Sequence, residues 1–349
     1  MIKNLLFFFF IFCLFVGNSQ VDTTDAVLKK LFIKSESAYM AFEKEHGKYI
    51  KTSNVLMHYS TWGDSTNTPF VWVHGTYQNT TEVVDFVDSV VNNGFYLIAI
   101  DYYGHGLTPI PEKEVSIYHV ADDIKFLLNN LKIDKTIIGG LSRGGCIASA
   151  FYDEYPESCL GIVLEDGGSF NFLKPRQNMS EEELRKRFAK KEYSNEIKSF
   201  NSKFELFKNY YNPVYGETPY WMFASMFQNN EGKWVWDNPN LQSLIEEKDS
   251  SKNMDRILRP FKSNLFNSSV SLMQPKIIYR NLNIPMLIFD PLGDDKNEFF
   301  NFHQQNLELQ KMHPNKIKIL TYENAIHGLH FMEIERFTQD LITFIKQFK

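Results

Sequence analysis

The pentapeptide Gly140-Leu141-Ser142-Arg143-Gly144 constrains this chain most, because a strand pattern precedes it and a helix pattern follows it. Thr136 to Gly139 is a β-branched run typical of a buried strand, and residues 145–152 read as a helix that closes before Pro156. A G-x-S-x-G turn between strand and helix is so tight that small residues must flank the serine. We therefore predict that Ser142 is a nucleophile held at a helix N-terminus. An ordinary strand-to-helix turn is the alternative.

Composition describes a large globular protein without the charge pattern of a nucleic-acid binder. The 349 residues are 43% hydrophobic and 15% aromatic, the net charge is −5, and no run of Lys or Arg is dense. The chain contains no H-E-x-x-H motif, no cluster of Cys and His, and no G-x-G-x-x-G after the first expected parallel strand. We expect no catalytic metal, no cofactor and no nucleic-acid partner.

The N-terminus has the pattern of a targeting segment. Lys3 supplies a positive start, residues 5–16 are unbroken apolar sequence, and Gly17-Asn18-Ser19 offers small residues before a cleavage point at Gln20. The apolar run is too short to span a bilayer comfortably. We predict a signal peptide over residues 1–19, export to the periplasm or the medium, and no stable membrane insertion after cleavage. A retained anchor is the alternative.

Two cysteines would remain after cleavage. Cys146 and Cys159 have the option of pairing in an exported protein, but two cysteines do not make a disulfide scaffold. Cys146 lies one helical turn after Ser142, and we favour a buried thiol there.

We expect a lead-in helix at 24–46, followed by a hairpin of residues 49–51 with 55–59. After these, apolar strands and helices alternate along most of the chain. We expect strands at 70–73, 95–100, 136–139, 160–164, 284–289 and 317–322, and helices at 81–92, 117–131, 297–312 and the C-terminus. This order predicts an α/β fold, a mostly parallel, doubly wound sheet with function at the carboxyl ends of its strands.

The alternation stops between residues 169 and 276, where aromatic and charged residues are scattered among helical stretches such as 181–191. We predict a helical cap over 169–276, inserted into a core of residues 48–168 and 277–349, with 20–47 as the helical lead-in. The aromatic runs at 220–223 and 234–236 either line an apolar acyl pocket or form the cap's own core.

Four motifs together resemble the α/β-hydrolase family. They are His74-Gly75-Thr76 after the first parallel strand, Asp101 to Gly106 in place of a D-x-R-G-x-G turn, the Gly140 to Gly144 turn, and Ala325 to His330 in place of the G-x-G-H segment. The resemblance covers roughly residues 48–168 and 284–348. It implies the α/β-hydrolase fold and a serine nucleophile with a histidine partner.

The resemblance implies that His327 is the base that takes the proton of Ser142. The acid that orients His327 is open. Family spacing after the strand at 286–289 favours Asp294, with Asp295 second, and some relatives place the acid where Asp166 stands. Asp290 lies too early in the loop.

The resemblance also implies an oxyanion hole made by the backbone N–H groups of Thr76 and Arg143. Tyr103 replaces the arginine usual in the aspartate turn, which leaves Asp101 without its customary partner. Our hypothesis is that the Arg143 guanidinium takes that place; alternatively it points to solvent or the cap, or meets an acidic substrate group. We expect His330 to be a packing residue.

These assignments predict hydrolysis of a small carboxylic ester through an acyl-enzyme. An amide or peptide hydrolase of aminopeptidase type is an alternative, with Glu165 or carboxylates of the cap as an anchor for a substrate amine. Lactone or carbon–carbon bond hydrolysis is also compatible, and a non-catalytic binding module is the alternative from another class. Related epoxide hydrolases and dehalogenases have aspartate at the elbow, unlike Ser142. The expected partner is a small ester or amide; the sequence gives no oligomeric state.

Overall fold

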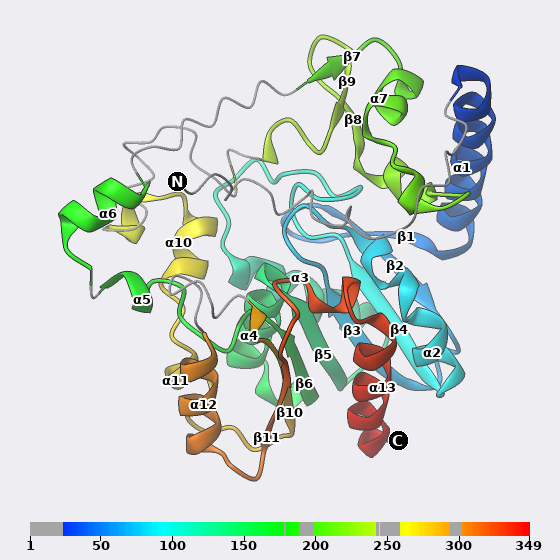
Figure 1. Ribbon diagram of the computed structural model, residues 1–349. Helices are drawn as coiled ribbons and strands as arrows, with labels where there is room; N and C mark the ends of the chain where they lie inside the picture. Colours follow the sequence, from blue (N-terminus) through cyan, green and yellow to red (C-terminus); the bar gives the residue numbers. More distant parts are fainter. Residues whose placement is uncertain (1–23, 178, 189–197, 242–243, 245–258, 294–301) are drawn as a thin grey trace.

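A computed structural model describes residues 24–177, 179–188, 198–241, 244, 259–293 and 302–349 (Figure 1). Within these residues eight strands form one sheet, in the order β1-β2-β4-β3-β5-β6-β10-β11. The strands are β1 (Gly47–Lys51), β2 (Leu56–Trp62), β3 (Thr68–Val73), β4 (Phe95–Ile100), β5 (Thr136–Leu141), β6 (Cys159–Glu165), β10 (Met286–Pro291) and β11 (Ile317–Tyr322). β2 pairs antiparallel with both β1 and β4, and the other pairings are parallel. The predicted hairpin and mostly parallel sheet are confirmed, while the signal segment 1–19 lies outside the described residues.

Helices cover both faces of this sheet, which explains why its central strands are apolar throughout (Figure 1). Val71 and Val73 of β3 face a core shared with α3 (Ile117–Asn130), α4 (Arg143–Glu154) and α12 (His303–Met312). Phe70 and Trp72 of the same strand face a second core shared with α2 (Val87–Asn92) and α13 (Ile334–Ile345). The sheet is therefore doubly wound as predicted.

The prediction of one continuous helix over residues 81–92 is wrong. Residues Thr80–Asp85 form the 3₁₀ helix η1, and α2 starts only after Phe86, whose φ of −126° and ψ of −7° leave the helical region. Burial of Glu82 in η1 accounts for the break, because its carboxylate turns inward to bond Trp72 and the backbone of Gly75. The hydrophobic pattern gave no sign of this inward carboxylate.

The lead-in helix is confirmed as α1 (Asp25–His46), but the segment at 169–276 is only partly the helical cap we predicted. Figure 1 shows it in two parts, one with α5 (Lys174–Gln177), α6 (Glu181–Phe188), α10 (Leu265–Ser271) and α11 (Pro275–Ile278), the other beside α1. The second part holds α7 (Lys203–Tyr210) and a small sheet of β7 (Ser199–Phe200), β9 (Trp234–Trp236) and β8 (Met226–Gln228). The remaining elements of the described residues are short 3₁₀ helices: η2 (Pro156–Ser158), η3 (Pro213–Tyr215), η4 (Tyr220–Ser225), η5 (Pro260–Lys262), η7 (Leu329–Phe331) and η8 (Lys346–Phe348).

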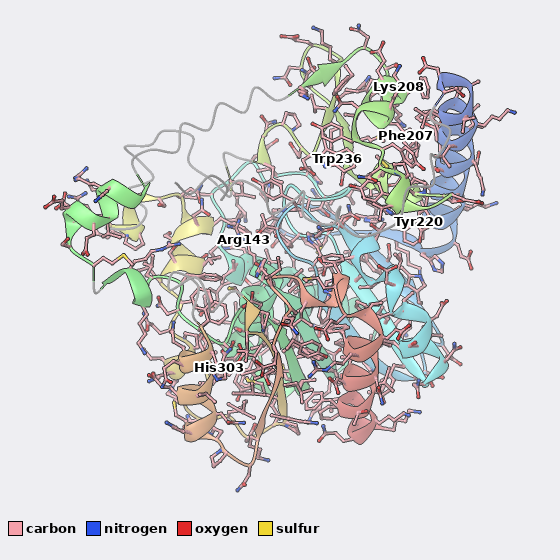
Figure 2. The ribbon with its side chains drawn as sticks, viewed as in Figure 1. Arg143, Phe207, Lys208, Tyr220, Trp236 and His303 are labelled. Carbon is pink, nitrogen blue, oxygen red and sulfur yellow. The ribbon has the colours of Figure 1, made fainter. Side chains whose placement is uncertain are left out.

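The aromatic runs of the cap form a core of their own. Phe32 of α1 packs against Phe207 and Phe223, with ring centroids 5.6 Å and 5.3 Å apart, and Trp236 packs on Tyr210 at 4.9 Å. Figure 2 shows the labelled rings at 207, 220 and 236 gathered near α1 and away from the carboxyl ends of the central strands. Of the two alternatives for these runs, the core is the one the structure supports.

Both cysteines are free and buried, so the disulfide alternative is not realised. Burial raises the pKa of the Cys146 thiol to about 12, which keeps it protonated near neutral pH. In the described residues, no helix combines the length and the apolar character that a bilayer crossing needs.

Candidate active site

Ser142 lies at the turn between β5 and α4 in a strained backbone conformation. Its φ is 54°, a left-handed value that a residue with a side chain adopts at an energetic cost. A Cβ on Gly140 would lie 2.4 Å from the carbonyl oxygen of Val73, and one on Gly144 would lie 2.0 Å from the same oxygen. Only glycine fits at both places, and the backbone N–H of Ser142 donates to the Glu165 carbonyl at 2.8 Å. The predicted nucleophile elbow is therefore present in the structure.

Asp166 and His327 meet at the same edge of the sheet. Asp166 directly follows β6, which lies beside β5, and His327 follows β11. The Nδ1 of His327 donates to Oδ2 of Asp166 at 2.5 Å. The Asp166 side chain is 9% exposed, whereas that of His327 is 35% exposed, so the histidine reaches the surface of the site. This is the arrangement in which a carboxylate fixes an imidazole tautomer.

The other acid candidates have different positions. Asp294 and Asp295 lie outside the described residues. Asp290 is the residue before the end of β10. It accepts hydrogen bonds from His303 at 2.6 Å and from Asn306 at 3.0 Å, and thus belongs to a separate polar cluster. The structure therefore pairs His327 with Asp166, whereas the spacing typical of the family had favoured Asp294.

A cavity of about 230 Å³ opens at the elbow. Ser142 lines it together with Thr76 and Arg143, the two residues predicted to donate backbone N–H groups to an oxyanion. Figure 2 shows Arg143 at the carboxyl end of the central strands, below the cap. The remaining lining residues precede or belong to α5 and α10: Phe172, Leu173, Arg176, Asn267, Val270 and Ser271. Most cavities for small ligands combine apolar walls with a few polar groups in this way.

A buried carboxylate holds the loop that carries Thr76. Glu82 accepts from the backbone N–H of Gly75 at 2.9 Å and from the Trp72 indole at 2.7 Å. Burial raises the pKa of Glu82 to about 7, although the nearby charge of His330 and these two hydrogen bonds oppose the rise. Nothing in the sequence singled out Glu82, because a glutamate in a helical pattern normally faces water.

The hypothesis that Arg143 replaces the missing arginine beside Asp101 is wrong. His58 of β2 is the cation at Asp101, with its Nδ1 2.7 Å from Oδ2, and its Nε2 lies 3.1 Å from a Glu43 oxygen. Tyr103, which stands at the arginine position, donates to Asp123 of α3 at 2.7 Å instead. Arg143 lines the cavity.

Asp101 ties two loops to the sheet through the backbone. Its carboxylate accepts from the N–H of Thr80 at 2.7 Å and from that of Leu107 at 2.9 Å. Burial lowers the pKa of His58, but the carboxylates of Asp101 and Glu43 outweigh this and raise it to about 9. His58 is therefore charged near neutral pH and completes a buried ion pair.

His330 does more than pack. Its Nδ1 lies 2.7 Å from Glu165 Oε2, its backbone N–H donates to Oε1 at 3.0 Å, and both side chains are fully buried. Burial lowers the pKa of His330, whereas the Glu165 charge raises it and prevails. Glu165 precedes Asp166, so the pair fastens the loop of His327 to the end of β6. Glu165 is thus not an anchor in the cavity for a substrate amine.

Among the described residues, no group of three or more His, Cys, Asp and Glu side chains is arranged to hold a metal ion. The site as described consists of a strained serine, a histidine–aspartate pair and a small cavity. These define the class: an α/β protein with a nucleophile elbow and a carboxylate-oriented histidine.

Comparison with known proteins gives the family. The sequence model of the alpha/beta hydrolase fold family matches residues 68–274. The chain therefore belongs to that family, and the predicted fold class is confirmed. This membership indicates an enzyme of the hydrolase class.

Individual relatives are distant. The chain is 28% identical over 116 residues to epoxide hydrolase 1 of Caenorhabditis elegans, a match covering 32% of this chain and 28% of the relative. It is 31% identical over 105 residues to a putative 2-succinyl-6-hydroxy-2,4-cyclohexadiene-1-carboxylate synthase of Bacillus subtilis, covering 30% and 38%. The chain thus spans well under half the length of these two curated relatives.

Solved structures match over more of the chain. A meta-cleavage product hydrolase of Pseudomonas fluorescens superposes with a TM-score of 0.58 at 19% identity, covering 88% of this chain and all (100%) of that one. A thermophilic esterase of Thermogutta terrifontis superposes with a TM-score of 0.54 at 17% identity, covering 86% and 98%. At this identity the similarity establishes the fold.

Replacing Gly144 with alanine tests the elbow packing. The new Cβ would meet backbone atoms of β3 that cannot move aside, so Gly144→Ala should destabilise the protein by at least about 3 kcal/mol in urea unfolding. Gly232→Ala is the control, because its Cβ would meet nothing within 4 Å and only its φ of +75° is unfavourable. We expect that control to cost about 1 kcal/mol. Equal costs for the two variants would show that the elbow has room.

His58 predicts a pH dependence of stability. Because its pKa is raised from 6.5 to about 9 on folding, its stabilising contribution is complete below about pH 6.5 and is lost as the pH rises through about 9. Wild type should lose a few kcal/mol of unfolding free energy over that window. His58→Gln should be less stable at pH 6 and should lack this fall, while His313→Gln, a remote control, should keep it. Parallel pH curves for wild type and H58Q in urea melts would contradict the assignment.

Proposed function

We propose that this protein is a serine hydrolase that cleaves a small carboxylic ester through an acyl-enzyme. The observation that carries the proposal is the elbow cavity, which Ser142, Thr76 and Arg143 line together. The hydrogen bond of His327 to Asp166, at 2.5 Å on the same sheet edge, supports it. Serine hydroxyls are poor nucleophiles near neutral pH, and this pair supplies the base that one needs.

Each residue then has a defined role. Ser142 Oγ attacks the ester carbonyl while His327 takes its proton, and the Asp166 carboxylate stabilises the resulting imidazolium. The backbone N–H groups of Thr76 and Arg143 hold the oxyanion, and each such donor typically contributes about 10²–10³ in rate. His327 passes the proton to the leaving alcohol, and an activated water then releases the acid from Ser142.

We assign the orienting acid to Asp166, in preference to Asp294. The chain order serine, acid, histidine is the same for both choices and fits the fold. The Asp166 carboxylate already accepts the hydrogen bond of the His327 Nδ1. Its neighbours Glu165 and His330 fix the two loops relative to each other, so the contact has structural support.

The cavity favours an ester over a peptide with a free amine. Glu165, one of the anchors considered for the aminopeptidase alternative, is fully buried and paired with His330. No lining residue of the described cavity is acidic, whereas Phe172, Leu173 and Val270 offer apolar walls for a short acyl chain. Lactone and carbon–carbon substrates fit the same residues, and the substrate panel below separates them.

The N-terminal pattern supports a second part of the proposal, export of the mature protein to the periplasm or the medium.

A fluorophosphonate probe should label wild type and not Ser142→Ala, because only an activated serine reacts. Wild type should hydrolyse short p-nitrophenyl esters faster than aminoacyl nitroanilides or γ-butyrolactone, measured as kcat/KM. Ser149→Ala is a control serine, since the Ser149 hydroxyl is buried and donates to the Gly145 carbonyl at 2.9 Å. Absence of both labelling and hydrolysis in folded protein would leave the binding-module alternative in place.

Asp166→Asn should lower kcat for the best ester about 10⁴-fold, because the amide would stabilise the wrong imidazole tautomer. Asp290→Asn is the matched control: it also removes a carboxylate from a histidine pair at the same sheet edge, and kcat should change less than tenfold. Asp294→Asn should behave like that control. Full activity of D166N together with loss of activity in D294N would transfer the role to Asp294.

A further inference from the structure

We infer that Glu82 is a positioning residue for the proposed reaction, because its carboxylate charge holds the Gly75–Thr76 peptide group where that group can stabilise the oxyanion. The inference deepens the proposed function and rests on it. Glu82 lies on η1, after the loop that carries Thr76, and is only 4% exposed. It is not among the residues that line the described cavity. Its influence on the reaction therefore passes through the loop.

Hydrogen bonds hold the peptide groups on both sides of Gly75. On one side, the Gly75 N–H donates to a Glu82 oxygen at 2.9 Å. On the other side, the Gly75 carbonyl accepts from the Gln78 N–H at 3.2 Å and from Nδ1 of His74 at 2.7 Å. That carbonyl and the Thr76 N–H belong to one planar peptide group, so fixing the direction of one fixes the direction of the other.

The Gly75 backbone also lies against the elbow. A Cβ on Gly75 would lie 2.9 Å from a methyl carbon of Leu141, the residue before Ser142. Because loop and elbow are this close, a small movement of the Gly75 backbone changes the position of the Thr76 N–H relative to the nucleophile. A hydrogen bond to a charged carboxylate is about twice as strong as one to a neutral group. Loss of the Glu82 charge therefore weakens the link that holds the donor in place.

Charged groups from three elements act on Glu82. Burial has the largest influence and raises its pKa; the charge of Glu165 adds to the rise, the charge of His330 opposes it, and the result is about 7. His330 is fully buried and holds its own charge through Glu165, at 2.7 Å, and through the more distant carboxylates of Glu82 and Asp85. Glu82 thus changes its charge close to neutral pH.

Two other titratable side chains beside this loop keep one protonation state over that range. Burial lowers the pKa of His74 to about 4 and raises the pKa of the Tyr102 phenol, so both are neutral near pH 7. Above pH 7 the Glu82 carboxylate is charged and binds the Gly75 N–H strongly. Below pH 7 it is neutral and binds that N–H weakly.

The ratio of kcat in wild type to kcat in Glu82→Gln, measured with a short p-nitrophenyl ester across pH, tests the inference. Glutamine has the shape of a protonated glutamic acid. The ratio should therefore be about 10–100 at about pH 8, fall with a midpoint near 7, and drop below about 3 at about pH 5.5, while KM changes less than about threefold. Titration of His327 affects both proteins and cancels in the ratio.

Two further variants complete the kinetic comparison. Glu82→Asp keeps the charge on a shorter side chain and should recover part of kcat at about pH 8. Asp123→Asn is the matched control, because it removes another buried carboxylate, which accepts from Tyr103 at 2.7 Å and from Asn54 at 2.8 Å. Its kcat should stay within about threefold of wild type at every pH.

A spectroscopic measurement does not depend on activity. The Trp72 indole N–H donates to Glu82 at 2.7 Å, so its resonance in ¹⁵N-tryptophan-labelled wild type should titrate with a midpoint near pH 7. The same resonance should stay constant in Glu82→Gln, and its absence from Trp72→Phe identifies it. The titration of wild type and the kinetics of Glu82→Asp give the result even where Glu82→Gln fails to fold.

The outcomes separate this inference from the proposed function. A kcat ratio that is constant with pH, or an indole resonance that does not titrate, would overturn the positioning role, while hydrolysis by wild type leaves the hydrolase standing. A folded wild type that neither reacts with the fluorophosphonate probe nor hydrolyses any ester would overturn the hydrolase, and the positioning role with it.

Discussion

The site depends on the close approach of the end of β3 to the start of α4. A Cβ on Gly144 would come within 2.0 Å of the Val73 carbonyl oxygen, so the two backbones touch where Ser142 turns. The same approach places the loop after β3, with Thr76, beside the nucleophile at the cavity. One backbone contact therefore fixes both the strained serine and the loop of Thr76, the residue that we propose as an oxyanion donor. Glu82, through its bond to the Gly75 N–H, keeps that loop from relaxing away.

Much of the fold was predictable because the signals are local. Strands buried on both faces are apolar along their length, and the elbow and the histidine loop are short motifs that keep their spacing. The carboxylate partner of His327 was harder to predict, because it depends on which strand ends lie side by side. β6 lies between β5 and β10, so the loops after β6 and β10 both reach the histidine loop, and sequence spacing alone favoured Asp294 over Asp166.

Two residues were misread for a related reason. His58 and Asp101 are far apart along the chain, but the antiparallel pairing of Tyr59 with Ile100 sets them side by side. The Asp101 N–H donates to the His58 carbonyl at 3.0 Å, which confirms that the two residues are neighbours across the sheet. The hypothesis from the sequence placed Arg143 beside Asp101 instead, because the register between strands cannot be read from the sequence. His330 was likewise predicted to be a packing residue, because its partner Glu165 lies at the end of β6, far away in the sequence.

The two parts of the cap have different surroundings. Its aromatic part packs on α1 and has its own core, so changes there act on stability. The part with α5 and α10 supplies the cavity wall, and short helices at the surface tolerate substitution better than a core does. The ends of the central strands thus position Ser142, Asp166 and His327, whereas α5 and α10 supply the wall of the cavity that Ser142 lines.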